Sequence, residues 1–314
     1  MFVDSNEFSS IRRCFSEQLG QLYSPGELKI ILKYLFLKRF DANASDYLLA
    51  DDKRLSESDL LFFHDALKRL RNNEPFQYVI GEAEFYGLLL KCDERALIPR
   101  PETEELVDWI LSAHFQSQIK PELELQAESR SNSQTEVSIL DICTGSGCIA
   151  LALKSKLPSV RVFALEYSED AIDLTKENAN FTGLELNVIC ADALTSNYND
   201  LISEQVDVIV SNPPYIPNLD KRKMAANVLD FEPEMALFVE DHDPLIFYRE
   251  ILHRSKSILK NDGWLYFEIH EDLSEEMRRL FEHSDFVNIE LRKDLQGRDR
   301  MIRGQVVTSV HERQ

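Results

Sequence analysis

Paired cysteines are missing from this sequence of 314 residues. The five cysteines, Cys14, Cys92, Cys143, Cys148 and Cys190, are odd in number and show neither a CxxC pair nor a nearby histidine. This pattern excludes a disulfide scaffold, argues against a zinc site, and is typical of reduced thiols in the cytosol. We therefore expect a cytoplasmic protein without a bound metal.

Long apolar runs and a targeting segment are missing as well. The first residues, from Met1 to Glu7, contain neither a basic stretch with an apolar core nor an arginine-rich, acid-poor leader. No apolar run approaches the roughly 20 residues that cross a bilayer. The sequence therefore predicts a soluble, unprocessed chain with no membrane partner.

Positive charge is scarce. The chain has 35 lysines and arginines against 55 aspartates and glutamates, which gives a formal net charge of −20. Residues 1–75 are nearly balanced, with 11 basic and 12 acidic side chains, which leaves 24 against 43 for the remainder. Because such a surface repels phosphate backbones, general binding to DNA or RNA lacks its usual driving force.

Residues 1–75 carry a helical pattern of apolar side chains. Apolar residues recur every three or four positions between Leu28 and Phe36, and a second segment repeats the pattern. Ser24 is a suitable cap for the first of these helices, with Pro25 in its first turn. We expect a small helical bundle here.

A linker, a helix and an insertion follow the bundle. Residues 76–98 alternate short apolar strands around Gly81 and Gly87, which predicts a β-hairpin linker. Pro101 fits the first position of the next helix. Residues 116–136 are polar and lack periodicity, so we expect a mobile surface insertion.

Apolar strands alternate with helical patterns through the rest of the chain, which predicts one α/β domain over residues 99–314 with a doubly wound sheet. A short polar turn from Gln296 to Asp299 joins the last two strands. It has no room for a crossover helix, so these strands must pair antiparallel. The expected strands are 138–142, 161–166, 186–190, 206–210, 264–269, 287–291 and 301–310.

Asn212, Pro213, Pro214 and Tyr215 form a distinctive turn that follows the apolar run 206–210. The two prolines stiffen the turn and donate no backbone hydrogen, so the carbonyls of Asn212 and Pro213 can face outward as acceptors. A planar NH2 group fits between the Asn212 side-chain oxygen and the Pro213 carbonyl, with the Tyr215 ring against its plane. These four residues are therefore the candidate catalytic and substrate-binding site.

A glycine-rich loop follows the first strand of the predicted sheet. Gly145, Gly147 and Ala150 match the dinucleotide pattern G-x-G-x-x-A, and Glu166 lies at a distance along the chain where an acid can hold a ribose. On this loop alone, an NAD-dependent oxidoreductase remains open. Such an enzyme gives no reason for the turn at 212–215.

Several sequence blocks together resemble the HemK/PrmC family of glutamine N5-methyltransferases. They are the run from Pro75 to Gly87, the segment IPRPETE at 98–104, the turn at 212–215 and the segment DLQGRDR at 294–300. The resemblance implies a class I S-adenosylmethionine-dependent methyltransferase fold, which is Rossmann-like and seven-stranded with an antiparallel end strand. It also implies methylation of the glutamine side-chain amide in the Gly-Gly-Gln loop of class I peptide chain release factors, which supports translation termination.

The resemblance assigns the cofactor S-adenosyl-L-methionine to the ends of the strands. It places Asp141 near the methionine amino group and Asn212 near the sulfonium. It gives the ribose hydroxyls to Glu166, and the adenine to Asp192 and Ala193. The methionine part is wrapped by Cys143, Thr144, Gly145, Ser146 and Gly147. Cys143 departs from the family, where a glycine is usual, so its side chain must turn away from the cofactor or narrow the pocket.

On the substrate side, the resemblance adds Arg100 and Glu232 to the turn at 212–215. It implies a release factor as partner, with no direct nucleic acid, and we expect a monomer. Residues 1–75 then read as a substrate-docking domain. We expect its basic pairs to contact the release factor, and the residues of this docking hypothesis are Arg12, Arg13, Lys38 and Arg39.

Two further functions remain open. An N6-adenine nucleic acid methyltransferase shares the turn at 212–215, but the net charge and the lack of a basic, aromatic-bearing recognition segment oppose it. A non-catalytic module could keep the fold and bind a release factor without modifying it. The unusual Cys143 leaves that alternative open, whereas the intact turn and the cofactor acids oppose it.

Overall fold

The computed structural model describes residues 3–115 and 137–307. The expected mobile insertion at 116–136 and the expected end of the last strand at Val310 lie outside these residues. The described chain forms two compact units, one of residues up to 82 together with 224–232, the other of 83–223 and the residues from 233 on. No helix in the described parts is long and apolar enough to cross a membrane.

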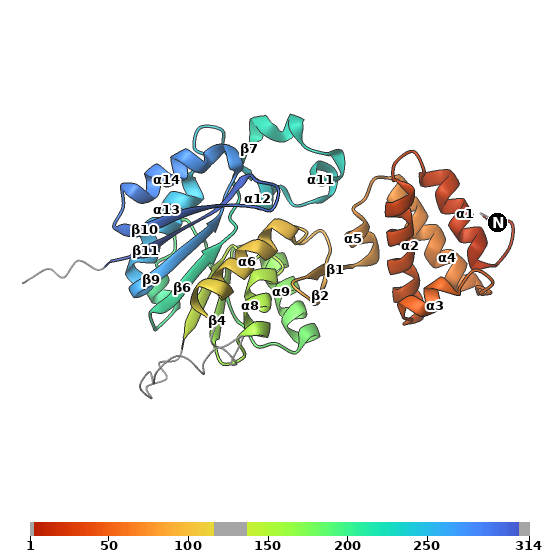
Figure 1. The fold of residues 1–314 in the computed structure, drawn as a ribbon, viewed down its shortest axis with the longest axis horizontal. Coiled ribbons are helices and arrows are strands. Elements are labelled where there is room, and N and C mark those ends of the chain that lie inside the picture. Colours follow the sequence, from red (N-terminus) through yellow and green to blue (C-terminus); the bar gives the residue numbers. More distant parts are fainter. Residues whose placement is uncertain (1–2, 116–136, 308–314) are drawn as a thin grey trace, which may run out of the picture. The chain divides into compact units, whose positions relative to one another are not determined.

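The first unit is a helical bundle, as the sequence pattern predicts (Figure 1). Ser24 caps the second helix of this unit as expected. Its hydroxyl accepts a hydrogen bond from the backbone N–H of Glu27, and the Glu27 carboxylate accepts one from the backbone N–H of Ser24. The buried ring of Phe8 lies 4.8 Å from that of Phe36 and 5.5 Å from that of Phe63, centroid to centroid. The helices are α1 (Phe8–Leu19), α2 (Pro25–Phe40), α3 (Ala44–Leu48), α4 (Glu57–Arg71) and α5 (Phe76–Ile80).

The start of the predicted β-hairpin segment, Phe76–Ile80, is helical instead. Pro75 occupies the N-cap, and Gly81, with φ of +75°, ends the helix after little more than one turn. Val79 and Ile80 pack into the core of the bundle. The sequence of such a short, mostly apolar segment cannot distinguish a helix from a strand, because the segment is too short to show a helical period.

The hairpin itself is shorter than expected. It consists of β1 (Glu82–Phe85) and β2 (Leu88–Lys91), joined at Tyr86 and Gly87, whose φ angles of +49° and +80° suit a tight two-residue turn. The next helix, α6 (Pro101–His114), begins with Pro101 as expected.

The second unit contains a twisted sheet, of which Figure 1 labels β10, β11, β9, β6 and β4. Its seven strands have the order β10-β11-β9-β6-β3-β4-β5. Because β3 pairs in parallel with both β4 and β6, the chain changes direction across the sheet at β3. This confirms the predicted doubly wound sheet. The strands are β3 (Ser138–Ile142), β4 (Arg161–Glu166), β5 (Asn187–Cys190), β6 (Val206–Ser211), β9 (Leu259–Glu268), β10 (Phe286–Lys293) and β11 (Asp299–Val306).

The last strand, β11, is antiparallel to both of its neighbours, as the short turn before it predicts. It lies inside the sheet, between β10 and β9, so the edge strands of the sheet are β10 and β5. The antiparallel strand β11 is therefore the last strand in the sequence, but it is not an edge strand of the sheet.

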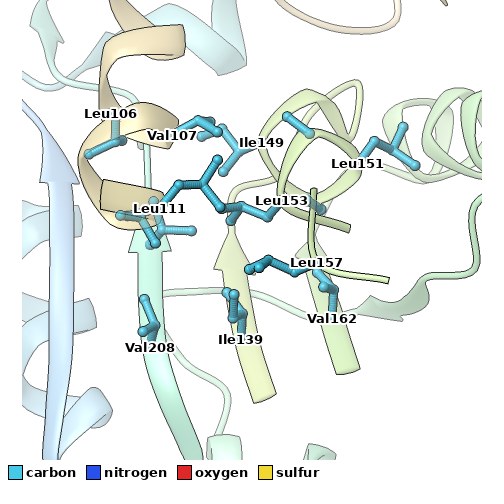
Figure 2. Packing of buried hydrophobic residues seen from close by; sticks show 14 of the residues in the cluster. Leu106, Val107, Leu111, Ile139, Ile149, Leu151, Leu153, Leu157, Val162 and Val208 are labelled. Carbon is cyan, nitrogen blue, oxygen red and sulfur yellow. The ribbon is translucent and has the colours of Figure 1, made fainter. Parts of the chain in front are cut away.

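Helices cover both faces of this sheet. On one face, α6 and α8 (Cys148–Lys156) place leucines such as Leu111 and Leu153 over Ile139 and Val208 (Figure 2). On the other face, α13 (Ile246–Ile258) and α14 (Ser274–Glu282) bury side chains against alternate strand residues. Burial on both faces explains why the central strands read as continuous apolar runs. The remaining helices of the layers are α9 (Glu169–Thr182) and α10 (Tyr198–Leu201).

The connection from β6 to α13 contains several short elements. The paired strands β7 (Ile216–Pro217) and β8 (Phe238–Val239) frame it. Each of its elements has six residues or fewer, which is too short for a periodic signal. Between the strands lie η2 (Asn218–Lys223), α11 (Ala226–Phe231) and α12 (Glu234–Leu237).

Candidate active site

The segments that follow β3, β4, β5 and β6 surround a cavity of about 410 Å³, which we call the strand-end cavity. Every residue that lines it belongs to the second unit. Its volume is that of a small-molecule pocket. Its place beside β3, where the strand order reverses, is where open α/β sheets bind ligands.

Most of the predicted site residues meet at the strand-end cavity. Asp141, Gly147, Pro213 and Tyr215 are not among the lining residues, although each is next to one that is or lies within the same loop. Glu232 does not line the cavity either, and it belongs to the first unit. The predicted residues that do line the cavity are Arg100, Cys143, Thr144, Gly145, Ser146, Glu166, Asp192, Ala193, Asn212 and Pro214.

Asp141 organises the loop after β3 from behind. Its Oδ2 accepts from the Thr144 hydroxyl at 2.5 Å and from the Ala150 backbone at 3.2 Å. Its Oδ1 is buried and has no hydrogen-bond partner among the described residues. Burial raises the pKa of Asp141 to about 7. The carboxyl group thus has one committed oxygen and one acceptor left over.

Helix α9 fixes the other side of the loop. Thr175 donates to the Gly145 carbonyl at 2.7 Å, and the Asn178 amide donates to the Ser146 carbonyl at 3.0 Å. Gly147 has a φ of +81°, and a Cβ placed there would lie 2.9 Å from the Thr175 methyl group. The loop is therefore held closely by α9, and a side chain at Gly147 would disturb it.

Cys143 also has a left-handed backbone, with φ of +60°, in the position where the family usually has glycine. Its side chain packs against the core beneath the sheet, and the residue still lines the strand-end cavity. Burial, together with the carboxylates of Glu166 and Asp141, raises the pKa of the Cys143 thiol. The thiol is therefore neutral and unsuited to act as a nucleophile.

Glu166 and Asp192 are anchored by neighbouring backbone groups. Glu166 accepts from the backbone of Gly145 at 2.9 Å, Tyr167 at 2.8 Å and Ser168 at 3.0 Å. Asp192 accepts from the backbone of Leu194 at 2.8 Å, and from the Thr195 hydroxyl. Because a carboxylate has about four acceptor positions, each group keeps capacity for a ligand.

The turn at 212–215 lies where β6 ends. Asn212 and Pro214 reach the strand-end cavity, while the Tyr215 ring packs edge-on to His270 with centroids 5.8 Å apart. Burial raises the pKa of the Tyr215 hydroxyl, so this group stays neutral. The turn thus places an amide beside the cavity and an aromatic ring behind it.

Two polar residues behind Asn212 escaped the sequence interpretation. The Thr103 hydroxyl donates to Glu268 Oε2 at 2.6 Å, and the Asn212 amide nitrogen lies 3.4 Å from the same hydroxyl. Glu268 is 3% exposed. An acid at the end of the apolar run 264–269 was the available signal, since a buried glutamate without a role is rare.

The polar groups at the strand-end cavity suit S-adenosylmethionine. Glu166 and Asp192 offer acceptors for the hydroxyl and amino groups of a nucleoside, and Leu165 and Phe247 add apolar wall. The buried Oδ1 of Asp141 lies behind the loop and is not part of the cavity lining. A nucleoside joined to an amino acid therefore finds both apolar contact and hydrogen-bond partners here.

Comparison with known proteins gives two matches to family models. The PrmC N-terminal domain matches residues 11–81, and the methyltransferase small domain matches residues 125–232. Among solved structures, the hMettl16 catalytic domain in complex with an RNA hairpin has a TM-score of 0.51 and 15% identity, and it covers 80% of this chain and 82% of that one. This likeness shows the fold alone.

Relatives with a curated name match nearly the whole chain. The release factor glutamine methyltransferase of Flavobacterium psychrophilum is 39% identical over 93% of this chain and 96% of its own length. Those of Streptococcus pneumoniae and Bacteroides thetaiotaomicron are 37% and 35% identical, over 93% and 91% of this chain and 97% and 95% of their own lengths. At this identity and coverage, the chain belongs to the release factor glutamine methyltransferase family.

Proposed function

We propose that this protein transfers a methyl group from S-adenosyl-L-methionine to the side-chain amide nitrogen of the glutamine in the Gly-Gly-Gln loop of class I release factors. The observation that carries the proposal is that Asn212 and Pro214 line the same cavity as Glu166 and Asp192. An amide-binding turn and a nucleoside-binding edge therefore share one space. Family membership supports this reaction and gives no support to an NAD-dependent oxidoreductase.

The residues that would hold the cofactor come from the ends of three strands. Cys143, Thr144, Gly145 and Ser146 would face its methionine part, and Glu166 its ribose. Asp192 and Ala193 would flank its adenine. When bound, S-adenosylmethionine supplies a methyl group on a positively charged sulfur.

The turn would act by positioning the substrate amide. An amide nitrogen is a weak nucleophile because its lone pair is shared with the carbonyl. The Asn212 side-chain oxygen and the Pro213 carbonyl would accept the two amide hydrogens, which orients the nitrogen and favours positive charge growing on it. Tyr215 lies next to these acceptors, where its neutral ring would limit access of water.

The helical unit is the proposed docking surface for the release factor. Its basic residues also have partners within the unit, since Arg12 pairs with Asp51, Lys38 with Glu82, and Arg39 with Asp59. Reversing those charges would therefore also disturb the fold. Arg13 is better suited to test docking, because its pair with Asp4 leaves 56% of the arginine side chain and 88% of the aspartate side chain exposed.

The proposal is tested by following labelled methyl groups. The protein is incubated with labelled S-adenosylmethionine and a release factor, with a glutamine-to-alanine variant of its loop, or with DNA and RNA. We expect label on the unaltered factor alone, at the glutamine nitrogen. Label on a nucleic acid would instead select the adenine methyltransferase, and binding of the factor without label would select the non-catalytic module.

A further inference from the structure

Thr103 and Glu268 form a hydrogen-bonded pair directly behind Asn212. The two strands that lead to Asn212 and Glu268 are parallel neighbours, with Ser211 of β6 opposite Phe267 of β9. Thr103 comes from the first turn of α6 and lines the strand-end cavity. Three elements that are distant in the sequence therefore bring one hydroxyl between an amide and a carboxyl group.

The hydrogen of the Thr103 hydroxyl decides how the Asn212 amide is oriented. This hydroxyl donates to Glu268 Oε2 at 2.6 Å. A hydroxyl has one hydrogen, so toward Asn212 it can only accept. The part of the amide that can donate is its NH2 group, which lies 3.4 Å from the Thr103 oxygen. The Asn212 oxygen must then point elsewhere.

We infer that Glu268 and Thr103 are positioning residues, which form a relay that presents the Asn212 side-chain oxygen to the substrate amide. The inference rests on the proposed function, in which that oxygen accepts a hydrogen from the substrate glutamine. The inverted amide would place its NH2 group against the NH2 group of the substrate, where neither can accept. At 3.4 Å the bond to Asn212 is weak, so the relay selects an orientation and adds little stability.

The surroundings of Glu268 shift its protonation into the neutral pH range. Burial raises the pKa of Glu268 to about 7, while the Thr103 hydrogen bond and the Arg300 charge oppose this rise. Ionisable groups from several neighbouring elements act on the Glu268 carboxyl. They are Arg100 at the N-cap of α6, Glu102 in its first turn, Arg300 of β11, Tyr215 of the turn, Tyr248 of α13 and Cys148 of α8.

The relay therefore predicts the direction of a pH effect on turnover. Below its pKa, Glu268 carries a proton and can donate to Thr103, whose hydroxyl can then donate to the Asn212 oxygen. Above its pKa, the carboxylate only accepts, and Thr103 can only accept from Asn212. Turnover should accordingly rise with pH through the neutral range as Glu268 ionises.

Isosteric variants separate the relay from simple packing. Thr103→Val removes the hydroxyl at nearly constant volume, and Thr103→Ser restores it. We expect Thr103→Val to lower kcat on release factor by about tenfold to a hundredfold, the loss typical of a misplaced reacting group. Its Kd for S-adenosylmethionine should stay at the wild-type value, and Thr103→Ser should recover most of kcat. Thr182→Val is a matched control, because among the described residues the Thr182 hydroxyl bonds only to carbonyls of its own helix.

Glu268→Gln and the double variant test whether the carboxyl group acts through Thr103. We expect Glu268→Gln to flatten the rise of kcat with pH, since glutamine does not titrate. In the Thr103→Val background, Glu268→Gln should cost no further activity, because the relay is already broken. Equal kcat for the valine and serine variants, additive losses in the double variant, or an unchanged pH rise in Glu268→Gln would each overturn the relay. A wild-type protein that leaves release factor unlabelled would instead overturn the proposed function.

Discussion

Cys143 has a left-handed backbone that side chains rarely adopt, with φ of +60° at the start of the loop after β3. A Cβ in this region costs about 1 to 2 kcal/mol, and glycine avoids that cost. We therefore expect Cys143→Gly to be more stable toward urea than Cys143→Ala by about 1 kcal/mol, because both variants lose the thiol and only alanine keeps the strain.

The alanine variant is the control for this comparison. Equal urea midpoints for the two variants, or a higher midpoint for alanine, would show that Cys143 stores no backbone strain. Urea unfolding does not depend on catalysis, so this comparison can be made even if the variants are inactive.

Single residues differ in how well the sequence reveals them. Glu166 ends an apolar run, and Asp192 and Asn212 each lie two residues after one. Parallel strands bring such positions to one edge, so their meeting could be foreseen. Thr103 and Glu268 are 165 residues apart, and their contact depends on how α6 packs over the sheet. No local pattern carries that information.

Packing between elements depends on one strand glycine. A Cβ at Gly304 of β11 would lie 2.6 Å from one carbon of the buried Phe281 ring in α14 and 3.2 Å from the Phe286 Cβ. We expect Gly304→Ala to lower the free energy of unfolding by about 1 to 3 kcal/mol, the usual cost of an overfilled core. Urea unfolding measures this cost.

A second glycine supplies the control for this prediction. Gly26 lies in the first turn of α2, and the nearest atom to a Cβ there is the Ser24 hydroxyl at 3.9 Å. Gly26→Ala should be neutral or stabilising by up to about 1 kcal/mol. If both variants lost the same stability, contact with Phe281 would not be the cause.

Some elements could be foreseen from apolar runs and capping signals. The strands β3 and β4 have the bounds that the apolar runs 138–142 and 161–166 predict, and α6 begins at Pro101 as its capping signals indicate. The prediction failed at α5, where five residues, four of them apolar, form a helix instead of a strand. Tertiary burial decides the conformation of such short runs, and their sequence alone does not.

Across the full chain, the charge is distributed unevenly between residues 1–75 and the remainder. The net charge of −20 comes almost entirely from beyond residue 75, where 24 basic residues face 43 acidic ones. This imbalance is readable from the sequence, as is the alternation that predicts the doubly wound sheet. The sequence does not tell which basic side chains are occupied by partners in the folded first unit.

Docking through the helical unit predicts an effect on whole release factor only. We expect Arg13→Glu to raise the KM for the intact factor severalfold at low salt, and less at high salt because screening weakens surface charges. The KM for an isolated Gly-Gly-Gln peptide should not change. The fold should be retained, since exposed ion pairs such as Arg13 with Asp4 contribute little stability.

Arg278→Glu provides the same charge reversal on an exposed position of α14 in the second unit. It should leave both KM values unchanged. If Arg278→Glu and Arg13→Glu raised the KM for the factor equally, net charge and not docking at the helical unit would explain the effect.

In the proposed reaction, the turn at 212–215 holds the substrate amide through the Asn212 side chain. Asn212→Ala tests this contact through kcat on release factor and the Kd for S-adenosylmethionine, with the exposed Asn199→Ala as control. We expect a fall in kcat of about a hundredfold or more with little change in Kd, the size of a lost polar contact to the transition state. Unchanged turnover in Asn212→Ala would show that the Asn212 side chain does not hold the substrate amide.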